Sequence, residues 1–424
     1  MQGTQAAYLK RSIWVYLFLL IFEGALRKWV FPGLSQPLLI VRDPLAAWLI
    51  FESLRLKVWS PNVFVILGIG LTLISFCLTL LFGHGNLPVA LYGSRMMLLH
   101  FPLIFIIGRV LNKEDVLQFG KAMLWCCIGM TLLVAVQFYS PQSAWINRGV
   151  AGELGSGFSG AMGYYRVPGT FSFTNGLSAF YGLCIPFIAF FWVSRDSGIS
   201  KILLYFATVA YLAAIPLSIS RTVVFQTVLT GIFIVVISAG QPKVIIRLFA
   251  TLGLGFFLFI FLTNFSFFET STKALSLRFE QAGHSEGGLE GTLVDRFLGG
   301  LVGAVSNVEA SWIGKGLGMG TNVGSTLMTG KRTFLVSEGE WGRLIGERGF
   351  ILGLFLIAIR LGLGIKMYLK SWRIANAGNI LPWLLLSFAL IPVVMGQWAQ
   401  TTSLGFAVFS GGLVFAAMRS EKCE

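Results

Sequence analysis

The feature that most constrains this chain is a succession of apolar runs, each about 20 residues long, that extends along its whole length. A helix of that length spans the roughly 30 Å of hydrocarbon in a bilayer. Because backbone N–H and C=O groups in lipid must be bonded within the chain, such runs form helices. The period-two alternation of a membrane β-barrel is absent from the sequence. The sequence therefore predicts an all-α integral membrane protein that crosses the membrane many times.

The runs predict about twelve membrane-spanning helices, and residues 1–424 form a single membrane domain. The predicted helices cover 12–31, 37–54, 61–82, 88–108, 117–139, 174–194, 201–219, 222–239, 244–264, 343–364, 379–398 and 402–418. Composition agrees, because 55% of the residues are hydrophobic and only 12% are charged. Soluble domains carry about twice that share of charge.

The net charge of +14 suits either nucleic acid or a membrane surface. Its distribution favours the membrane, because the basic residues concentrate in every second connection between predicted helices. They are Lys10 and Arg11, Arg55 and Lys57, Arg109 and Lys113, Arg195 and Lys201, Lys243 and Arg247, Lys366, Lys370 and Arg373, and Arg419 and Lys422. The positive-inside rule then places both termini in the cytoplasm, and no nucleic-acid partner is expected. Arg27 and Lys28, at the outer end of the first helix, depart from the pattern.

Two long connections, 140–173 and 265–342, fall on the external side of this topology. A long loop in a compact protein usually has a function or contains structure of its own. Within the second loop, 271–282 and 290–306 have the apolar periodicity of short amphipathic helices. We expect the chemistry of the protein to lie on this external face.

Charged residues also occur at membrane depth, where they mark function or pairing. Glu23 and Arg27 are spaced i, i+4, and Arg42 and Asp43 open the next helix. We favour a structural ion-pair cluster between the first two helices; a proton or ion relay is the alternative. Arg95 has no acidic neighbour in sequence, so it either extends to the outer surface or points into a cavity.

Five external arginines are candidates for binding an anion: Arg166, Arg221, Arg278, Arg296 and Arg343. Guanidinium forks bind phosphate oxygens in pairs and keep their charge when partly buried. Asn175, at the start of a predicted helix, adds unpaired backbone donors and a positive dipole end. Each arginine alone also suits an interfacial anchor, but together they favour a lipid-linked phosphate or pyrophosphate. The scattered histidines and the cysteines, which lack CxxC spacing, predict no metal site.

The segment 337–349, SEGEWGRLIGERG, is unusually charged and precedes an apolar run. Arg343 and Glu347 are spaced i, i+4 as a structural pair, and Glu340 shares their helical face. Trp341 suits the membrane interface and would place Glu338 facing the external cavity. In the alternative interpretation, Glu338 and Glu340 stabilise the helix N-terminus and pair with Arg343.

Four motifs in this order resemble the O-antigen ligase and O-antigen polymerase superfamily. They are RVPGTFSFTNG from Arg166, SISRTVVF from Ser218 to Phe225, GKGLGMG from Gly314 to Gly320, and Glu347 with Gly349 and Gly353. The resemblance implies a metal-independent, cofactor-free GT-C-type glycosyltransferase of the bacterial inner membrane. It would act on undecaprenyl-pyrophosphate-linked oligosaccharide at the periplasmic face, with Arg166 and Arg221 holding the pyrophosphate. Arg278, Arg296, Arg343, Asn175 and Glu340 are the further expected substrate contacts.

One position departs from the ligase pattern, in which a histidine lies nine residues before the Glu of the last motif. Here that position is Glu338, which we predict to be the catalytic base. The substitution favours a polymerase that joins lipid-linked repeats into exopolysaccharide, capsule or O-antigen. Such an enzyme would work beside a chain-length regulator and a flippase of the same pathway. The alternatives are ligase-type transfer to lipid A or another acceptor, and a flippase or transporter, although the sequence has no internal repeat.

Overall fold

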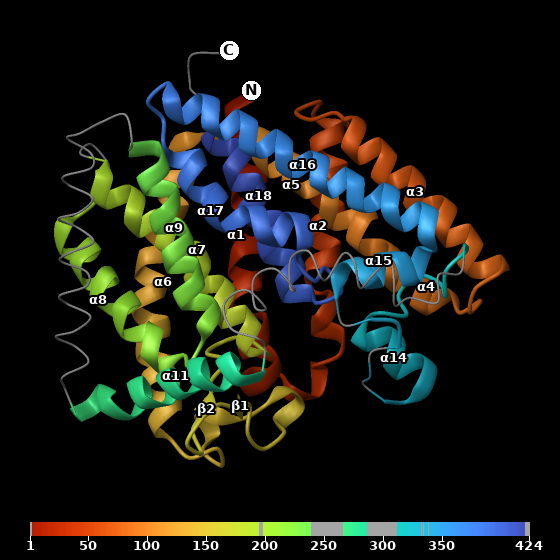
Figure 1. The fold of residues 1–424 in the computed structure, drawn as a ribbon. Helices are drawn as coiled ribbons and strands as arrows, with labels where there is room; N and C mark the ends of the chain where they lie inside the picture. The colour runs from red at the N-terminus through yellow and green to blue at the C-terminus, as the bar shows by residue number, and fades with distance from the viewer. Residues whose placement is uncertain are drawn as a thin grey trace.

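The computed structural model describes residues 2–194, 198–238, 266–285 and 312–419, apart from 332, 334 and 338 (Figure 1). The described chain is almost entirely helical. Its strands are β1 (Phe158–Ser159) and β2 (Tyr165–Arg166), which pair antiparallel as a small hairpin. Within the described residues, six helices are long and apolar enough to cross a membrane. The predicted all-α membrane class is thus confirmed, whereas the count of twelve spanning helices stays a prediction.

Most helices lie at the predicted positions, although α1 begins well before residue 12 and α16 ends well after residue 364. Those of the first half are α1 (Gln2–Ala25), α2 (Arg42–Arg55), α3 (Val63–Leu81), α4 (Leu87–Arg95), α5 (Phe101–Val110), α6 (Lys113–Tyr139) and α7 (Thr174–Val193). Those of the second half are α8 (Lys201–Leu217), α9 (Arg221–Ser238), α11 (Ser266–Ser285), α14 (Asn322–Thr329), α15 (Glu340–Arg348), α16 (Phe350–Asn376), α17 (Leu381–Met395) and α18 (Thr401–Ala417). The π-helical turns Leu26–Val30 and Met96–His100 follow α1 and join α4 to α5. The predicted helix 244–264 lies outside the described residues.

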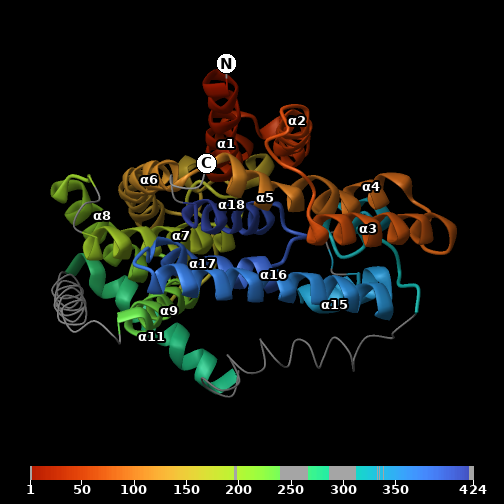
Figure 2. The same cartoon turned by 90° about the horizontal axis from the view of Figure 1, so that it is seen from above.

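The outer helices expose apolar side chains as a membrane protein does. Only 28% of α3 is buried, and Ile66, Leu67, Leu73 and Ile74 are each more than half exposed. A continuous apolar face of this kind is rare on a soluble monomer and suits contact with lipid. By contrast, 72% of α7 and 72% of the segment Leu87–Val110 are buried. Figure 2 shows α7 and α5 among other helices inside the bundle, whereas α4 lies beside α3 at its edge.

The centre of the bundle is built where α5, α17 and α18 pack closely. A Cβ added to Gly412 of α18 would lie 2.6 Å from Cβ of Ile107, and one added to Gly108 would lie 2.5 Å from Cβ of Phe415. Small residues at these positions let the helix backbones approach, as is common between membrane helices. Trp383 of α17 and Trp398, which follows α17, are also buried in the bundle.

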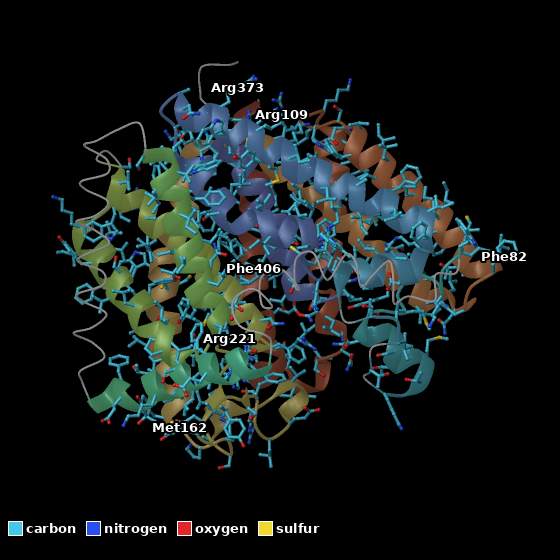
Figure 3. The ribbon with its side chains drawn as sticks, viewed as in Figure 1. Phe82, Arg109, Met162, Arg221, Arg373 and Phe406 are labelled. Carbon is cyan, nitrogen blue, oxygen red and sulfur yellow. The ribbon has the colours of Figure 1, made fainter. Side chains whose placement is uncertain are left out.

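The two ends of the bundle carry different features. Arg109 and Arg373 lie at the end from which α1 starts, and Arg221 and Met162 lie in the opposite half (Figure 3). We call the end of the bundle that carries Arg109 and Arg373 the terminal end. The half that carries the β1–β2 hairpin, α11 and the start of α9 is called the hairpin end.

The predicted helix 343–364 is wrong as one helix, because it breaks at Gly349 into α15 and α16. Gly349 has φ +83°, and a Cβ there would lie 2.1 Å from the Trp312 carbonyl oxygen. In one continuous helix Glu340 and Arg360 would be about 30 Å apart. Instead, Arg360 Nη1 lies 2.6 Å from Glu340 Oε1, so α15 folds back along α16.

Candidate functional site

The β1–β2 hairpin positions Arg166 at the hairpin end. Arg166 ends β2 and pairs across the ladder with Phe158. Gly160, between the strands, lies against the α8–α9 turn, since a Cβ there would be 3.2 Å from Ile219 Cδ1. Arg221 begins α9 two residues after Ile219. The hairpin therefore rests on the turn that presents Arg221.

The α8–α9 turn holds a strained residue. Ile219 has φ +46°, although β-branched residues strongly disfavour the left-handed region, and its side chain is buried. Holding a residue there costs on the order of 1–3 kcal/mol and requires support from its surroundings. The next residue supplies part of that support, because Ser220 Oγ lies 2.8 Å from Ser178 Oγ of α7. The starts of α7 and α9 are thereby joined.

Arg278 lies on α11, the third element at the hairpin end. The α11 helix confirms the predicted amphipathic helix 271–282. Ser271, Ala274 and Leu275 form the buried face of α11. Arg278 follows them at helical spacings of seven, four and three, so it shares that face. Burial, and then the charges of Arg278 and Arg221, lower the pKa of Arg166 below its ordinary value. Arg166, Arg221 and Arg278 are therefore neighbours, and we call them the arginine cluster.

Two members of the arginine cluster, Arg166 and Arg278, carry charge that no carboxylate among the described residues neutralises. The Nε atom of each is buried without a hydrogen-bond partner. Buried donors without acceptors are unfavourable, and like charges repel, so an anion with several oxygens would stabilise this arrangement.

Helix N-termini add to the positive potential at the hairpin end. The α7 helix begins at Thr174, and no side chain caps it at Phe173. Its first backbone N–H groups and positive dipole end suit an anion. Asn175 is exposed in this first turn, and Ser178, one turn further, is bonded to the residue before Arg221. Asn175 thus lies on the same side of the molecule as the arginine cluster.

The segment between Arg166 and Asn175 is anchored on the charged end of the first helix. Lys28 Nζ donates to the Gly169 carbonyl oxygen at 2.6 Å, and Arg27 Nη1 donates to Ser172 Oγ at 2.9 Å. The Thr170 hydroxyl donates to the Ile21 carbonyl oxygen at 2.7 Å. Arg27 and Lys28, the exceptions to the charge alternation, therefore have a structural task that the sequence did not reveal.

The predicted ion-pair cluster of the first two helices is confirmed. Glu23 lies 3.6 Å from Arg27 within the first helix and 3.3 Å from Arg42 of α2. Arg95 neither extends to the surface nor faces a cavity, because it is buried and pairs with Asp43 at 2.5 Å. Sequence distance hid this pair, since 52 residues separate the partners.

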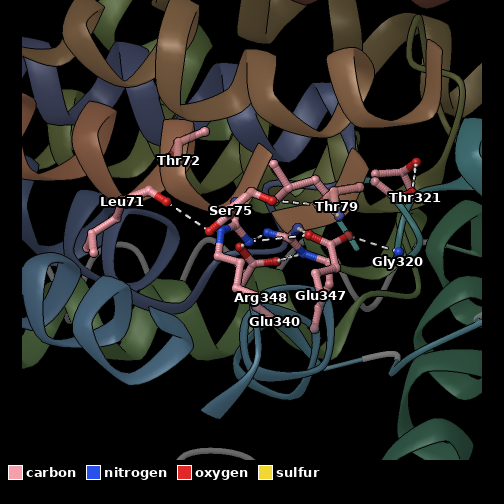
Figure 4. Close-up of polar contacts among 12 residues, drawn as sticks. Leu71, Thr72, Ser75, Thr79, Gly320, Thr321, Glu340, Glu347 and Arg348 are labelled. Atoms are coloured by element: carbon pink, nitrogen blue, oxygen red, sulfur yellow. Dashed lines mark hydrogen bonds and ion pairs between the residues drawn. The ribbon is translucent and has the colours of Figure 1, made fainter. Parts of the chain in front are cut away.

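A second charged cluster, the buried ion network, consists of Glu340, Arg343, Glu347, Arg348 and Arg360. Figure 4 labels Glu340, Glu347 and Arg348 of this network. Arg343 binds Glu340 through two bonds of 2.8 and 2.9 Å and Glu347 through one of 2.6 Å. Arg348 lies 3.3 Å from Glu347. All five side chains are at most 4% exposed, so the predicted Arg343–Glu347 pair is confirmed as part of a larger network.

Arg360 was not among the predicted site residues, although a lone arginine inside an apolar run is a signal for one. Its remaining donors bind the carbonyl oxygens of Val393 at 3.0 Å and Gly396 at 2.9 Å. Its guanidinium carbon also lies 4.0 Å from the centre of the Trp398 ring. Arg360 thus ties the start of α15 to α16 and to the segment after α17.

The glycine-rich segment 314–320 seats the buried ion network against α3 and α4. Gly320 N donates to Glu347 Oε1 at 2.9 Å, and Leu317 N donates to Thr79 Oγ1 of α3 at 2.9 Å. A Cβ added to Gly93 of α4 would lie 2.3 Å from Gly318 N. Here the glycines permit close backbone contact.

Burial disfavours the charged form of Glu340, but Arg343 and Arg360 outweigh it and hold the pKa of this carboxyl below its ordinary value. Glu340 and Arg343 therefore neutralise each other within the network, and their predicted contact with substrate stays a prediction. Both line a cavity of about 20 Å³ together with Ser337 and Gln400.

The predicted site residues thus divide into three groups. The structure brings Arg166, Arg221 and Arg278 together, with Asn175 at the same end. It places Arg343 and Glu340 in the buried ion network. Glu338 and Arg296 lie outside the described residues. No protein-family model matches this sequence, and no match to it was found among curated proteins.

Proposed function

We propose that this protein is a membrane glycan polymerase that uses undecaprenyl-pyrophosphate-linked oligosaccharide as its substrate. The observation that carries the proposal is the arginine cluster, whose partly buried and mutually repelling cations a multivalent anion would stabilise. The motif resemblance adds the substrate class, because Arg166 and Arg221 belong to the two segments that resemble the polymerase and ligase superfamily.

A pyrophosphate suits the arginine cluster for chemical reasons. Two linked phosphates offer several oxygens to guanidinium forks that approach from the hairpin, from α9 and from α11. Arg166, Arg221 and Arg278 are each partly exposed, so a ligand can reach them. Fixed positive charge at this place would also stabilise the leaving pyrophosphate, which is usually a large term in such a reaction.

In the proposed reaction, a hydroxyl oxygen of the acceptor sugar attacks the anomeric carbon of the donor glycan. The bond from that carbon to the pyrophosphate oxygen breaks, and undecaprenyl pyrophosphate leaves. Glu338 accepts the hydroxyl proton as general base. Glu338 directly precedes the N-cap of α15, Gly339, and the buried ion network fixes the start of that helix. We therefore assign the network a positioning role.

The proposed orientation places the hairpin end in the periplasm and the terminal end in the cytoplasm of the bacterial inner membrane. Its support is the gathering of Lys57, Arg109, Lys366, Lys370 and Arg373 around one pocket at the terminal end. In this orientation the loops 140–173 and 265–342 are periplasmic, as the polymerisation of exported lipid-linked repeats requires.

A chain-length assay with purified protein in proteoliposomes and lipid-linked oligosaccharide tests the proposal. We expect a ladder of polymer from the native chain and none from Arg221→Ala or Glu338→Gln, with both variants folded in the membrane. Arg148→Gln, an exposed arginine of the same loop as Arg166, serves as the control and should keep activity. Movement of lipid without new glycosidic bonds would instead favour a flippase, and transfer only to an added lipid A acceptor would favour a ligase.

A further inference from the structure

A pocket of about 890 Å³ opens at the terminal end, on the opposite side from the arginine cluster. It lies among the ends of α2, α5, α16 and α18 and the segment that joins α2 to α3. Six basic residues line it: Lys57, Arg109, Lys366, Lys370, Arg373 and Arg419. Figure 3 shows Arg109 and Arg373 near each other at this end.

The charge of this pocket is of one sign. No Asp or Glu is among the residues that line it, within the described chain. No ion pair to Lys57, Arg109, Lys370 or Arg373 is found there either. The six basic residues of the pocket come from four separate stretches of sequence, and the fold brings them together around one cavity. Such a cavity attracts anions.

The other walls of the pocket are apolar. Leu54, Phe105, Phe415 and Met418 lie beside the basic side chains, and Trp59 lines the segment between α2 and α3. A basic rim above an apolar wall suits a molecule with an anionic head and a hydrocarbon tail better than a free anion. Basic pockets between membrane helices on the cytoplasmic side are typical sites for acidic lipid headgroups.

Lys57 lies at this pocket in a backbone conformation that lysine disfavours. The α2 helix ends in a Schellman turn, in which Val58 N donates to the Ser53 carbonyl oxygen at 3.1 Å and Lys57 N donates to that of Leu54 at 3.0 Å. Lys57 occupies the left-handed position of this turn, with φ +53°, where glycine is preferred. The turn would therefore form more easily without the lysine.

We propose that this pocket binds the phosphate headgroup of an acidic membrane phospholipid, with an acyl chain along Phe105 and Phe415. The lipid would connect the ends of α2, α5, α16 and α18 at the cytoplasmic surface. This site is separate from the arginine cluster and does not depend on the proposed polymerase activity.

Native mass spectrometry of the full chain in detergent, titrated with phosphatidylglycerol, cardiolipin or phosphatidylcholine, tests the proposal. We expect acidic lipids to bind more tightly than phosphatidylcholine. The variant Lys57→Gly should lower that affinity about fivefold and Lys370→Gln with Arg373→Gln about 25-fold, at roughly fivefold per charge. The control Arg11→Gln with Lys201→Gln removes two exposed basic residues elsewhere and should keep the native affinity.

The variant Lys57→Gly also distinguishes a loss of lipid binding from a loss of folding stability. Its thermal midpoint without added lipid should equal or exceed that of the native chain, because glycine relieves the left-handed conformation. Equal binding of phosphatidylcholine and acidic lipids, or native affinity in both pocket variants, would overturn the proposal. Competition by inorganic phosphate at the lipid's own concentration would overturn the lipid assignment and indicate a soluble phosphate compound.

Discussion

Replacing Glu340 by Gln should strongly destabilise the protein. Glu340 Oε1 accepts bonds of 2.8 Å from Arg343 and 2.6 Å from Arg360, and Oε2 accepts one of 2.9 Å from Arg343. Two carboxylates balance three guanidinium groups in the network, and the variant leaves one carboxylate. Breaking a buried ion pair by removing one partner costs about 3–5 kcal/mol. At about 2.1 cal/mol/K of unfolding entropy per residue, we therefore expect a thermal midpoint lower by about 3–6 °C.

Differential scanning fluorimetry of the purified protein in detergent measures this effect. The exposed Glu153→Gln is the matched control and should leave the midpoint unchanged. Adding Arg360→Met to Glu340→Gln removes one uncompensated cation. The double variant should therefore lose less stability than the sum of the losses in Glu340→Gln and Arg360→Met measured singly. A Glu340→Gln midpoint equal to that of the control, or fully additive losses, would refute the electrostatic reasoning.

Acidification should reproduce part of this loss. The pKa of folded Glu340 lies below its ordinary value of 4.5. The stability that its ion pairs contribute is therefore complete above pH 4.5 and is lost as the pH falls through the folded pKa. Thermal midpoints measured from pH 6 downward should fall less in Glu340→Gln than in the native chain. Gly349→Ala should cost more than about 1 kcal/mol, because the left-handed residue abuts the Trp312 carbonyl. Gly129→Ala, at an open position of α6, should be neutral or stabilising in the same fluorimetric assay.

The hydrophobic runs predicted most helices because lipid imposes a single solution on an apolar segment. That rule gives no information on where a helix turns back. The apolar run after residue 349 and the charged stretch before it seemed one helix, yet the break at Gly349 depends on the close approach of Trp312, which is distant in sequence. Only the folded contact shows why a glycine is required there.

The candidate site was predictable in part, because arginines on one side of the predicted topology suit an anion. Arg166, Arg221 and Arg278 were predicted as external arginines that suit a phosphate, and the fold brings them together. Arg343 was predicted both as an anion contact and as the partner of Glu347. The fold confirms that pair and adds Glu340 and Arg360 to it. Helical spacing revealed the Arg343–Glu347 pair. It did not reveal the bond between Arg360 and Glu340, because 20 residues separate these partners.

The central claim is that the arginine cluster holds a pyrophosphate, and the affinity of the purified protein for undecaprenyl pyrophosphate tests it most directly. We expect the variant Arg166→Gln with Arg278→Gln to bind at least about 100-fold more weakly, since each charged hydrogen-bonding group contributes roughly 1.5–3 kcal/mol. Arg148→Gln, in the same loop as Arg166, should bind as the native chain does. Equal affinity in the double variant and the control would contradict the account.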